Sequence, residues 1–199
     1  MKRQRGFNLM ELAVTLTLAG AIMSLGVPNF IQFRANNLLT STANDFLAVV
    51  LTARTEALKR QGPVAVCGSA NPEDPEAECA DADITGYIAF ADANNDCLRD
   101  AGEDIVRAQT EINEAIQTDA DGVCLSFAAN GFRQIIPDRA TVNRAVFCDD
   151  RGDALTGIGD TDSFARGFEV LPTGRARITR NRDEIVSWDA DFSVACEGS

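Results

Sequence analysis

A segment from Asp92 to Glu103 has oxygen side chains at the spacing of a calcium-binding loop. They stand at positions one, three, five, nine and twelve of twelve residues, and the seventh position offers a main-chain carbonyl. Calcium prefers such hard oxygen ligands, but loops of this type normally have Gly at position six, where this chain has Cys97. A calcium site and a solvated acidic loop both stay open. The predicted ligands are Asp92, Asn94, Asp96, Leu98, Asp100 and Glu103.

A second segment, residues 174–182, contains four arginines and no acid. Alternation along a strand places Arg175 and Arg177 on one face, with Arg180 and Arg182 near the turn beyond it. A row of guanidinium groups can neutralise successive phosphates, so these arginines are candidate DNA contacts. The alternative is a solvated edge strand whose arginines pair with neighbouring Asp or Glu.

The composition excludes several functions. The chain of 199 residues has 18 Lys and Arg against 30 Asp and Glu, a net charge of −12, and it contains no His. Ser-His-Asp or Cys-His catalysis and the usual His-containing zinc sites are therefore excluded. Binding of nucleic acid by the whole surface is disfavoured for the same reason, because phosphate affinity comes mostly from clustered cations. We expect no enzyme.

Glu11 is the only ionisable residue between Phe7 and Phe33, a stretch long enough to cross a bilayer as a helix. Lys2, Arg3 and Arg5 precede this stretch and predict a cytoplasmic N-terminus. A carboxylate within a bilayer costs about 2.5–3.5 kcal/mol unless it is paired, so Glu11 needs a cation. A plain membrane anchor gives no reason for Glu11. A cleaved signal peptide would need a small-residue cleavage site, which the apolar stretch lacks.

The six cysteines all follow the apolar stretch at irregular spacings, which indicates disulfides in an oxidising compartment. Six cysteines allow 15 pairings. We expect Cys148 to pair with Cys196, and the other four to pair among the earlier strands. A disulfide from Cys97 could also stabilise a left-handed turn at that residue, which otherwise costs about 1–2 kcal/mol. The cysteines are Cys67, Cys79, Cys97, Cys124, Cys148 and Cys196.

Helical periodicity continues beyond the apolar stretch. Apolar residues recur every three or four positions from Leu39 to Ala57, which predicts an amphipathic continuation of the same helix. Pro28 should bend or locally melt this helix, and Gly62-Pro63 should end it, with Gly62 left-handed. Short runs rich in β-branched residues follow and predict an α+β domain with antiparallel sheets packed on the helix. The expected strands are Val64–Cys67, Thr85–Ala91, Ile105–Gln109, Val123–Ala128, Arg133–Ile136, Val142–Cys148, Gly167–Leu171, Ala176–Thr179 and Ile185–Trp188; residues 69–83 and 149–163 are expected loops.

Residues 5–12, RGFNLMEL, closely resemble the class III signal of type IV pilins and type II secretion pseudopilins. The resemblance implies that a prepilin peptidase cuts after Gly6 and methylates the new amine of Phe7. It also implies that Glu11 pairs with the Phe7 amine of a neighbouring subunit during assembly, with Pro28 in the same assembly helix. Further segments resemble the GspH/FimT branch: residues 53–60, 64–67 and 86–92, and Phe127 with Gly131. Tyr87 departs from the Trp often found in that branch.

The resemblance implies a pilin fold with a leader (1–6), a transmembrane and polymerisation helix (7–33), its amphipathic continuation (34–62) and a periplasmic β-rich domain with disulfides (63–199). It implies a minor type IV pilin in the inner membrane, later part of a surface filament, with other pilins and the prepilin peptidase as partners. The Gly-Arg-x-Arg sequence from Gly174 is similar to the motif of FimT-type pilins that bind double-stranded DNA, which would make Arg175 and Arg177 backbone contacts. The alternative function is an H-type pseudopilin of type II secretion.

Overall fold

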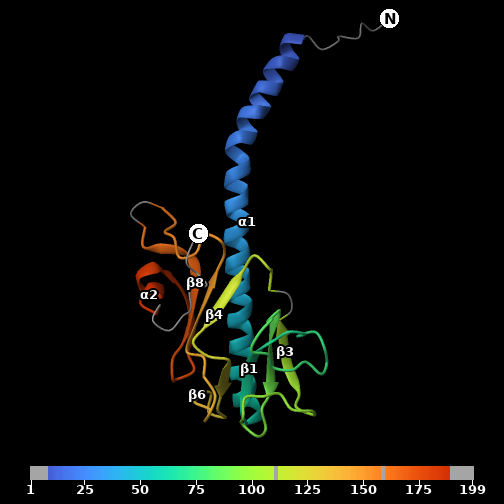
Figure 1. The fold of residues 1–199 in the computed structure, drawn as a ribbon, viewed down its shortest axis with the longest axis vertical. Coiled ribbons are helices and arrows are strands. Elements are labelled where there is room, and N and C mark those ends of the chain that lie inside the picture. Colours follow the sequence, from blue (N-terminus) through green and yellow to red (C-terminus); the bar gives the residue numbers. More distant parts are fainter. Residues whose placement is uncertain (1–8, 110–111, 158–159, 189–199) are drawn as a thin grey trace, which may run out of the picture. The chain divides into compact units, whose positions relative to one another are not determined.

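The computed structural model describes residues 9–109, 112–157 and 160–188 (Figure 1). The chain divides into two compact units, one that extends to Leu38 and one that begins at Leu39. Helix α1, Leu9–Arg60, contributes to both units. The second unit contains all the strands, and each unit is described by itself.

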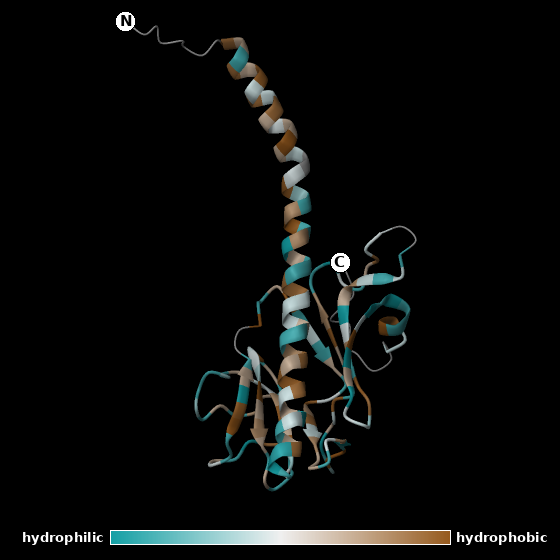
Figure 2. Ribbon diagram, turned by 180° about the vertical axis from the view of Figure 1, so that it is seen from behind, coloured by the Kyte–Doolittle hydropathy of each residue, from teal (hydrophilic) through white to brown (hydrophobic). Residues whose placement is uncertain are grey.

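The first unit is the N-terminal part of α1. Its large apolar side chains are exposed, and Figure 2 shows hydrophobic residues along this part of the helix. By length and composition, α1 contains a segment that is apolar enough to cross a membrane. The helix continues through Pro28 without a break, so local melting, one of the two expected effects of Pro28, is not found.

The second unit begins with the amphipathic part of α1. The predicted apolar face is confirmed, because its residues are almost completely buried. The helix ends one residue earlier than expected: Gln61, not Gly62, is left-handed (φ 55°), and the Gly62 N–H donates to the carbonyl of Ala57 over 3.3 Å. This bond closes the last helical turn, as in a Schellman cap. The buried face comprises Leu39, Ala43, Phe46, Val50, Ala53 and Ala57.

Two antiparallel sheets pack on this helix, as the expected α+β fold requires. One sheet has the order β3-β2-β1-β5-β6 and the other has the order β4-β7-β8-β9. The strands of the first sheet are β1 (Val64–Ser69), β2 (Gly86–Ala91), β3 (Ile105–Gln109), β5 (Cys124–Phe127) and β6 (Arg133–Gln134). Those of the second are β4 (Gln117–Ala120), β7 (Arg144–Cys148), β8 (Asp162–Val170) and β9 (Ala176–Asn181).

Phe46 of α1 joins the two sheets. Its ring centroid lies 4.6 Å from that of Tyr87 in β2, 5.5 Å from Phe147 in β7 and 4.9 Å from Phe168 in β8. Burial of Tyr87 in this cluster raises the pKa of its hydroxyl to about 12. A single helical side chain therefore contacts the cores of both sheets.

Three segments differ from the sequence expectation. Ile185–Trp188 was expected as a strand, which is wrong: residues 182–186 form a short helix, α2 (Arg182–Val186). The Asn181 side chain accepts the Glu184 N–H over 3.0 Å and caps this helix. Strand β4 was not expected, because its residues are mostly polar, and β8 begins at Asp162, within an expected loop.

Two glycines allow the β8–β9 turn to approach the β5–β6 turn closely. Gly131 and Gly174 both have left-handed backbones, with φ 75° and 76°. A Cβ at Gly174 would lie 2.0 Å from the carbonyl oxygen of Gly131, which is a backbone atom and cannot easily move aside. These turns therefore require Gly at position 174.

We expect Gly174→Ala to lower the free energy of unfolding by about 2–4 kcal/mol, from left-handed strain together with the steric clash. Gly102→Ala is the matched control, because Gly102 is also left-handed (φ 95°) but a Cβ there meets nothing within 4 Å. Urea unfolding of the detergent-solubilised chain measures both variants. Equal losses in the two variants would contradict the steric explanation.

Candidate functional sites

The predicted assembly residues lie at the N-terminal end of α1. Glu11 is in the first described turn of the helix, and its side chain is exposed. Gly6 and Phe7 lie outside the described residues, so cleavage, methylation and the pairing of Glu11 with an amine stay predictions. Pro28 lies within the same apolar helix.

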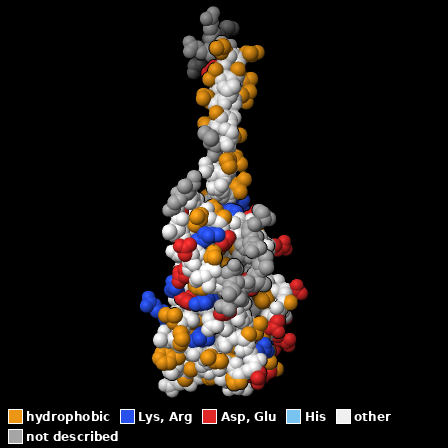
Figure 3. Space-filling view, turned by 60° about the vertical axis from the view of Figure 1, so that its left-hand side comes forward, with side chains coloured by type: hydrophobic (Ala, Val, Ile, Leu, Met, Phe, Trp, Pro, Cys, Tyr) orange, Lys and Arg blue, Asp and Glu red, His pale blue; other side chains and the backbone are white. Residues whose placement is uncertain are grey.

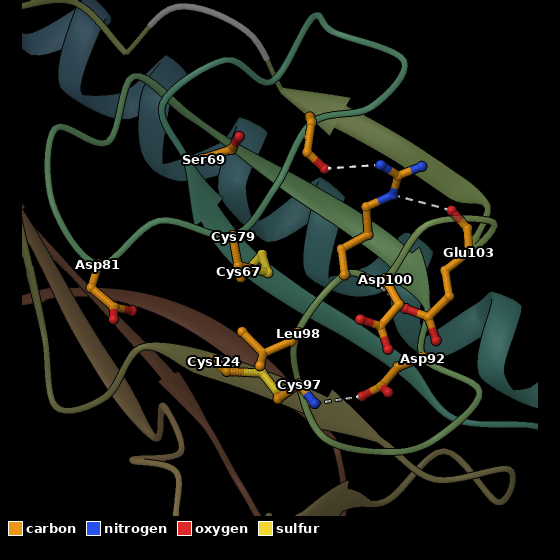
Figure 4. The surroundings of a disulfide bond; sticks show 12 residues. Cys67, Ser69, Cys79, Asp81, Asp92, Cys97, Leu98, Asp100, Glu103 and Cys124 are labelled. Carbon is orange, nitrogen blue, oxygen red and sulfur yellow. Dashed lines mark hydrogen bonds between the residues drawn. A yellow bond between two sulfur atoms is a disulfide. The ribbon is translucent and has the colours of Figure 1, made fainter.

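The acidic loop from Asp92 to Glu103 is closed by its own hydrogen bonds (Figure 4). The carboxylate of Asp92 is fully buried and accepts the backbone N–H groups of Asp96 over 3.1 Å and Cys97 over 3.0 Å. At the other end of the loop, Glu103 accepts the N–H groups of Ala93 and Asp100, over 2.7 and 3.0 Å. The loop carboxylates thus act as acceptors for the loop backbone.

Cys97 has the left-handed conformation that position six of a calcium loop requires, with φ 63°. It forms a disulfide with Cys124 in β5, so the loop is tied to the sheet at this turn. Cys67 in β1 forms a second disulfide with Cys79. The expectation of disulfides is confirmed by these two bonds, whereas Cys196, the expected partner of Cys148, lies outside the described residues.

Side chains of the predicted calcium ligands bond one another in this structure. Within the described ranges, no three acidic or cysteine side chains converge closely enough to hold a metal ion. The amide nitrogen of Asn94 instead lies 3.0 Å from an oxygen of Asp96 and 2.8 Å from one of Asp100. Calcium binding stays a prediction, and calorimetric titration can test it.

Asp92 should stabilise the loop without any metal. Asp92→Ala leaves two N–H groups without an acceptor, and we expect it to lower the free energy of unfolding by about 1–3 kcal/mol. Asp104→Ala is the control, because the Asp104 side chain is 75% exposed and pairs with Arg60 at the surface; we expect a change of at most about 0.5 kcal/mol. Thermal unfolding followed by circular dichroism measures both.

The pH dependence of this effect follows from the burial of Asp92. Burial raises the pKa of its carboxyl, although the N–H groups of Cys97 and Asp96 lower it in part. A raised folded-state pKa means that folding favours the protonated acid, so its contribution is lost as the pH rises through that pKa. The stability advantage of the wild type over Asp92→Ala should shrink above about pH 4, the ordinary pKa of Asp. An advantage that grows with pH would contradict this assignment.

The four arginines between residues 174 and 182 are mostly paired with acids. Arg177 in β9 lies between Glu169 of β8 and Glu184 of α2, and both carboxylates bond its guanidinium. These bonds, to Glu184 first, raise the pKa of Arg177. Arg180 lies 3.8 Å from Asp162, and Arg182 lies 3.1 Å from Asp153. Strand β9 is an edge strand of its sheet, as expected if its arginines pair with neighbouring acids.

Arg175 differs from the other three. It is exposed and has no acidic partner within the part of the chain that the structure describes. The structure therefore does not bring the four predicted arginines together as one free cationic row.

Sequence reasoning missed two arginines that organise the domain. Arg54 of α1 donates to the carbonyls of Gly131 over 3.0 Å and Thr173 over 3.2 Å. Arg166 of β8 is buried and donates to the carbonyl of Phe164 and to the hydroxyl of Thr40 in α1, over 2.6 and 3.1 Å. Burial lowers the pKa of Arg166 to about 10. No charge pattern in the sequence distinguishes these two from surface arginines.

A helix with an exposed apolar N-terminal part and a C-terminal part packed under two antiparallel sheets is the fold of a pilin-like protein. Residues 42–174 match the family model described as type II transport protein GspH. Because this match covers more than half of the chain, the chain belongs to the GspH family. The family consists of pilin and pseudopilin proteins, which are structural proteins and not enzymes.

Two crystal structures of the Pseudomonas aeruginosa type IV minor pilin FimU are similar to this chain. One match covers 83% of this chain and 99% of the FimU chain, with 16% sequence identity and a TM-score of 0.49. The other, from a second crystal form, covers 80% and 100%, with 16% identity and a TM-score of 0.46. No curated protein sequence matches the chain.

Proposed function

We propose that this chain is a minor subunit of a type IV pilus, held in the inner membrane by the N-terminal part of α1 before assembly. The observation that carries the proposal is Glu11, a lone acid in an apolar helix long enough to span a bilayer. An unpaired carboxylate there is costly, and the amine of a neighbouring subunit would neutralise it. Membership of the GspH family supports assembly with other pilin-class subunits.

The proposal includes maturation of the N-terminus. Cleavage after Gly6 would create the amine of Phe7 and would remove Lys2, Arg3 and Arg5, which a bilayer disfavours. An H-type pseudopilin of a type II secretion filament is the alternative, supported by membership of the GspH family of type II transport proteins. Purification of the filament that contains the chain, followed by identification of its major subunit, distinguishes the two.

We expect Glu11→Ala to reduce incorporation into filaments roughly tenfold or more, the effect of losing about 1.4 kcal/mol of subunit affinity. Thr15→Ala is the matched control: Thr15 is four residues further along α1, and its hydroxyl bonds only within the helix, to the carbonyl of Leu12. The measurement is the ratio of filament-bound to membrane-bound chain in sheared cells. Normal incorporation of Glu11→Ala would refute the proposal.

DNA binding by Arg175 and Arg177 would be an additional function of the subunit. The ion pairs of Arg177 are evidence against it. A phosphate would have to compete with Glu169 and Glu184, in a protein of net charge −12. Of the four arginines between residues 174 and 182, Arg175 alone is exposed without an acidic partner among the described residues. One such contact does not make a strong duplex site.

We expect the wild-type chain not to shift duplex DNA in a gel assay at about 150 mM salt, where phosphate contacts are strongly screened. Glu184→Gln should increase any binding seen at low salt if Arg177 is a DNA contact, because it frees the guanidinium. Glu56→Gln is the control, since it removes the same charge beside Lys59 and Arg60 on α1. Wild-type binding that persists at 150 mM salt and is lost in Arg175→Ala would establish the DNA function.

A further inference from the structure

An exposed apolar surface lies at the β6 edge of the five-stranded sheet, and three segments that are distant in the sequence form it. They are the end of α1, the chain around β6 and the β8–β9 turn. Ile135 is 76% exposed, Phe132 50% and Leu58 49%. Figure 3 shows hydrophobic side chains gathered on one flank of the lower part of the globular domain. We call this surface the β6 patch; it comprises Arg54, Leu58, Phe132, Arg133, Ile135, Leu171 and Arg175.

Backbone contacts hold the three segments of the β6 patch in place. The Arg54 guanidinium donates to Gly131 and Thr173, one residue in each turn. The Arg133 N–H donates to the carbonyl of Pro172 over 3.1 Å, which joins β6 to the β8–β9 turn. A surface held in this way loses little conformational freedom when a partner binds.

The β6 patch carries cations that lack carboxylate partners. Arg54 bonds only carbonyl oxygens, and Arg175 is exposed without an acid beside it, within the described parts of the chain. The exposed guanidinium of Arg175 offers its N–H groups to a partner, and a carboxylate is the acceptor that binds them most strongly. The patch thus favours a partner surface that is both acidic and apolar.

The same molecule has such a surface on another side of the sheet. Residues 70–104 contain eleven acids and one arginine, so this segment carries −10 of the net charge of −12. Its loops pack on the sheet through the buried Ala77 and Cys97, in one cluster with Ile88 of β2. Tyr87, the residue before Ile88, contacts Phe46 of α1, so alternation places the acidic loops and the helix on opposite faces. We call residues 70–104 the acidic face.

The acidic face also exposes apolar side chains. Ile84 is 42% exposed and Leu98 is 40% exposed, in loops that bear Asp83 and Asp100. In Figure 3 acidic side chains gather on the flank opposite to the hydrophobic side chains of the lower part. The charge and the apolar content of the acidic face are therefore complementary to those of the β6 patch.

We propose that the β6 patch of one chain binds the acidic face of a second copy of this chain. The two surfaces are different, so the interface is heterologous. This interaction rests on the proposed function, because it would hold two copies of the minor subunit side by side within the filament. The paired arginines of β9 and α2 take no part, since Arg177, Arg180 and Arg182 already face acids of their own chain.

The test uses full-length chain in detergent, with two differently tagged copies that both carry Glu11→Ala, so that pairing through the membrane helices does not contribute. We expect one tagged copy to capture the other at 50 mM salt and much less at 500 mM, where exposed ion pairs are screened. Arg175→Glu should reduce capture about fivefold, since it replaces an attractive pair by a repulsive one. Arg175 makes no contact that the fold needs, so this variant should fold normally.

Arg107→Glu is the matched control. Arg107 is an exposed arginine of β3, at the other edge of the same sheet, and its side chain bonds Thr52 and no acid among the described residues. Arg107→Glu causes the same change in net charge as Arg175→Glu, and we expect no loss of capture. Ile135→Ser removes apolar surface from the patch without a charge change, and it should also reduce capture.

A photocrosslinking residue at position 135 identifies the partner surface. Crosslinks to residues 70–104 of the second copy support the proposal. Absence of self-capture, equal capture by Arg175→Glu and wild type, or crosslinks only to duplex DNA or to a different protein would overturn it. Because incorporation into filaments is measured separately with Glu11→Ala, failure of self-capture leaves the proposed filament function standing.

Discussion

The domain depends on one helical face that serves as the core of two sheets. Phe46 contacts β2 of the first sheet and β7 and β8 of the second, and the small residues Ala43, Ala53 and Ala57 let the sheets approach the helix closely. Either sheet without the helix would expose an apolar face to water. The C-terminal part of α1 is therefore a part of the globular domain, and not merely a linker to the membrane.

Much of the fold could be predicted because its signals are local. The three- and four-residue spacing from Leu39 to Ala57 identified the buried helical face, and runs of β-branched residues located most of the strands. Strand β4 lacks such a run, since its sequence is Gln-Thr-Asp-Ala and its pairing with β7 is a long-range property. Helix α2 was mistaken for a strand because its apolar residues outweighed the cap that Asn181 provides.

The candidate sites were less predictable, because their chemistry depends on partners that the sequence does not reveal. Four arginines in nine residues resemble a cationic row. The register of β8 and β9, however, places Glu169 directly opposite Arg177, and α2 adds Glu184. In the acidic loop, Asp92 and Glu103 accept backbone N–H groups of the loop itself, and the sequence does not indicate these bonds. Residue type can be read from a sequence, whereas the protonation and pairing of a side chain require the fold.

The disulfide between Cys97 and Cys124 makes the conformation of the acidic loop depend on thiol oxidation. While its thiol is reduced, Cys97 is free to leave the left-handed region, which is unfavourable for a residue with a Cβ. The buried Asp92 carboxylate would then lose the turn whose N–H groups it accepts. The final shape of this loop should therefore be reached only after thiol oxidation, so the reduced chain would present a different surface at this loop from the oxidised chain.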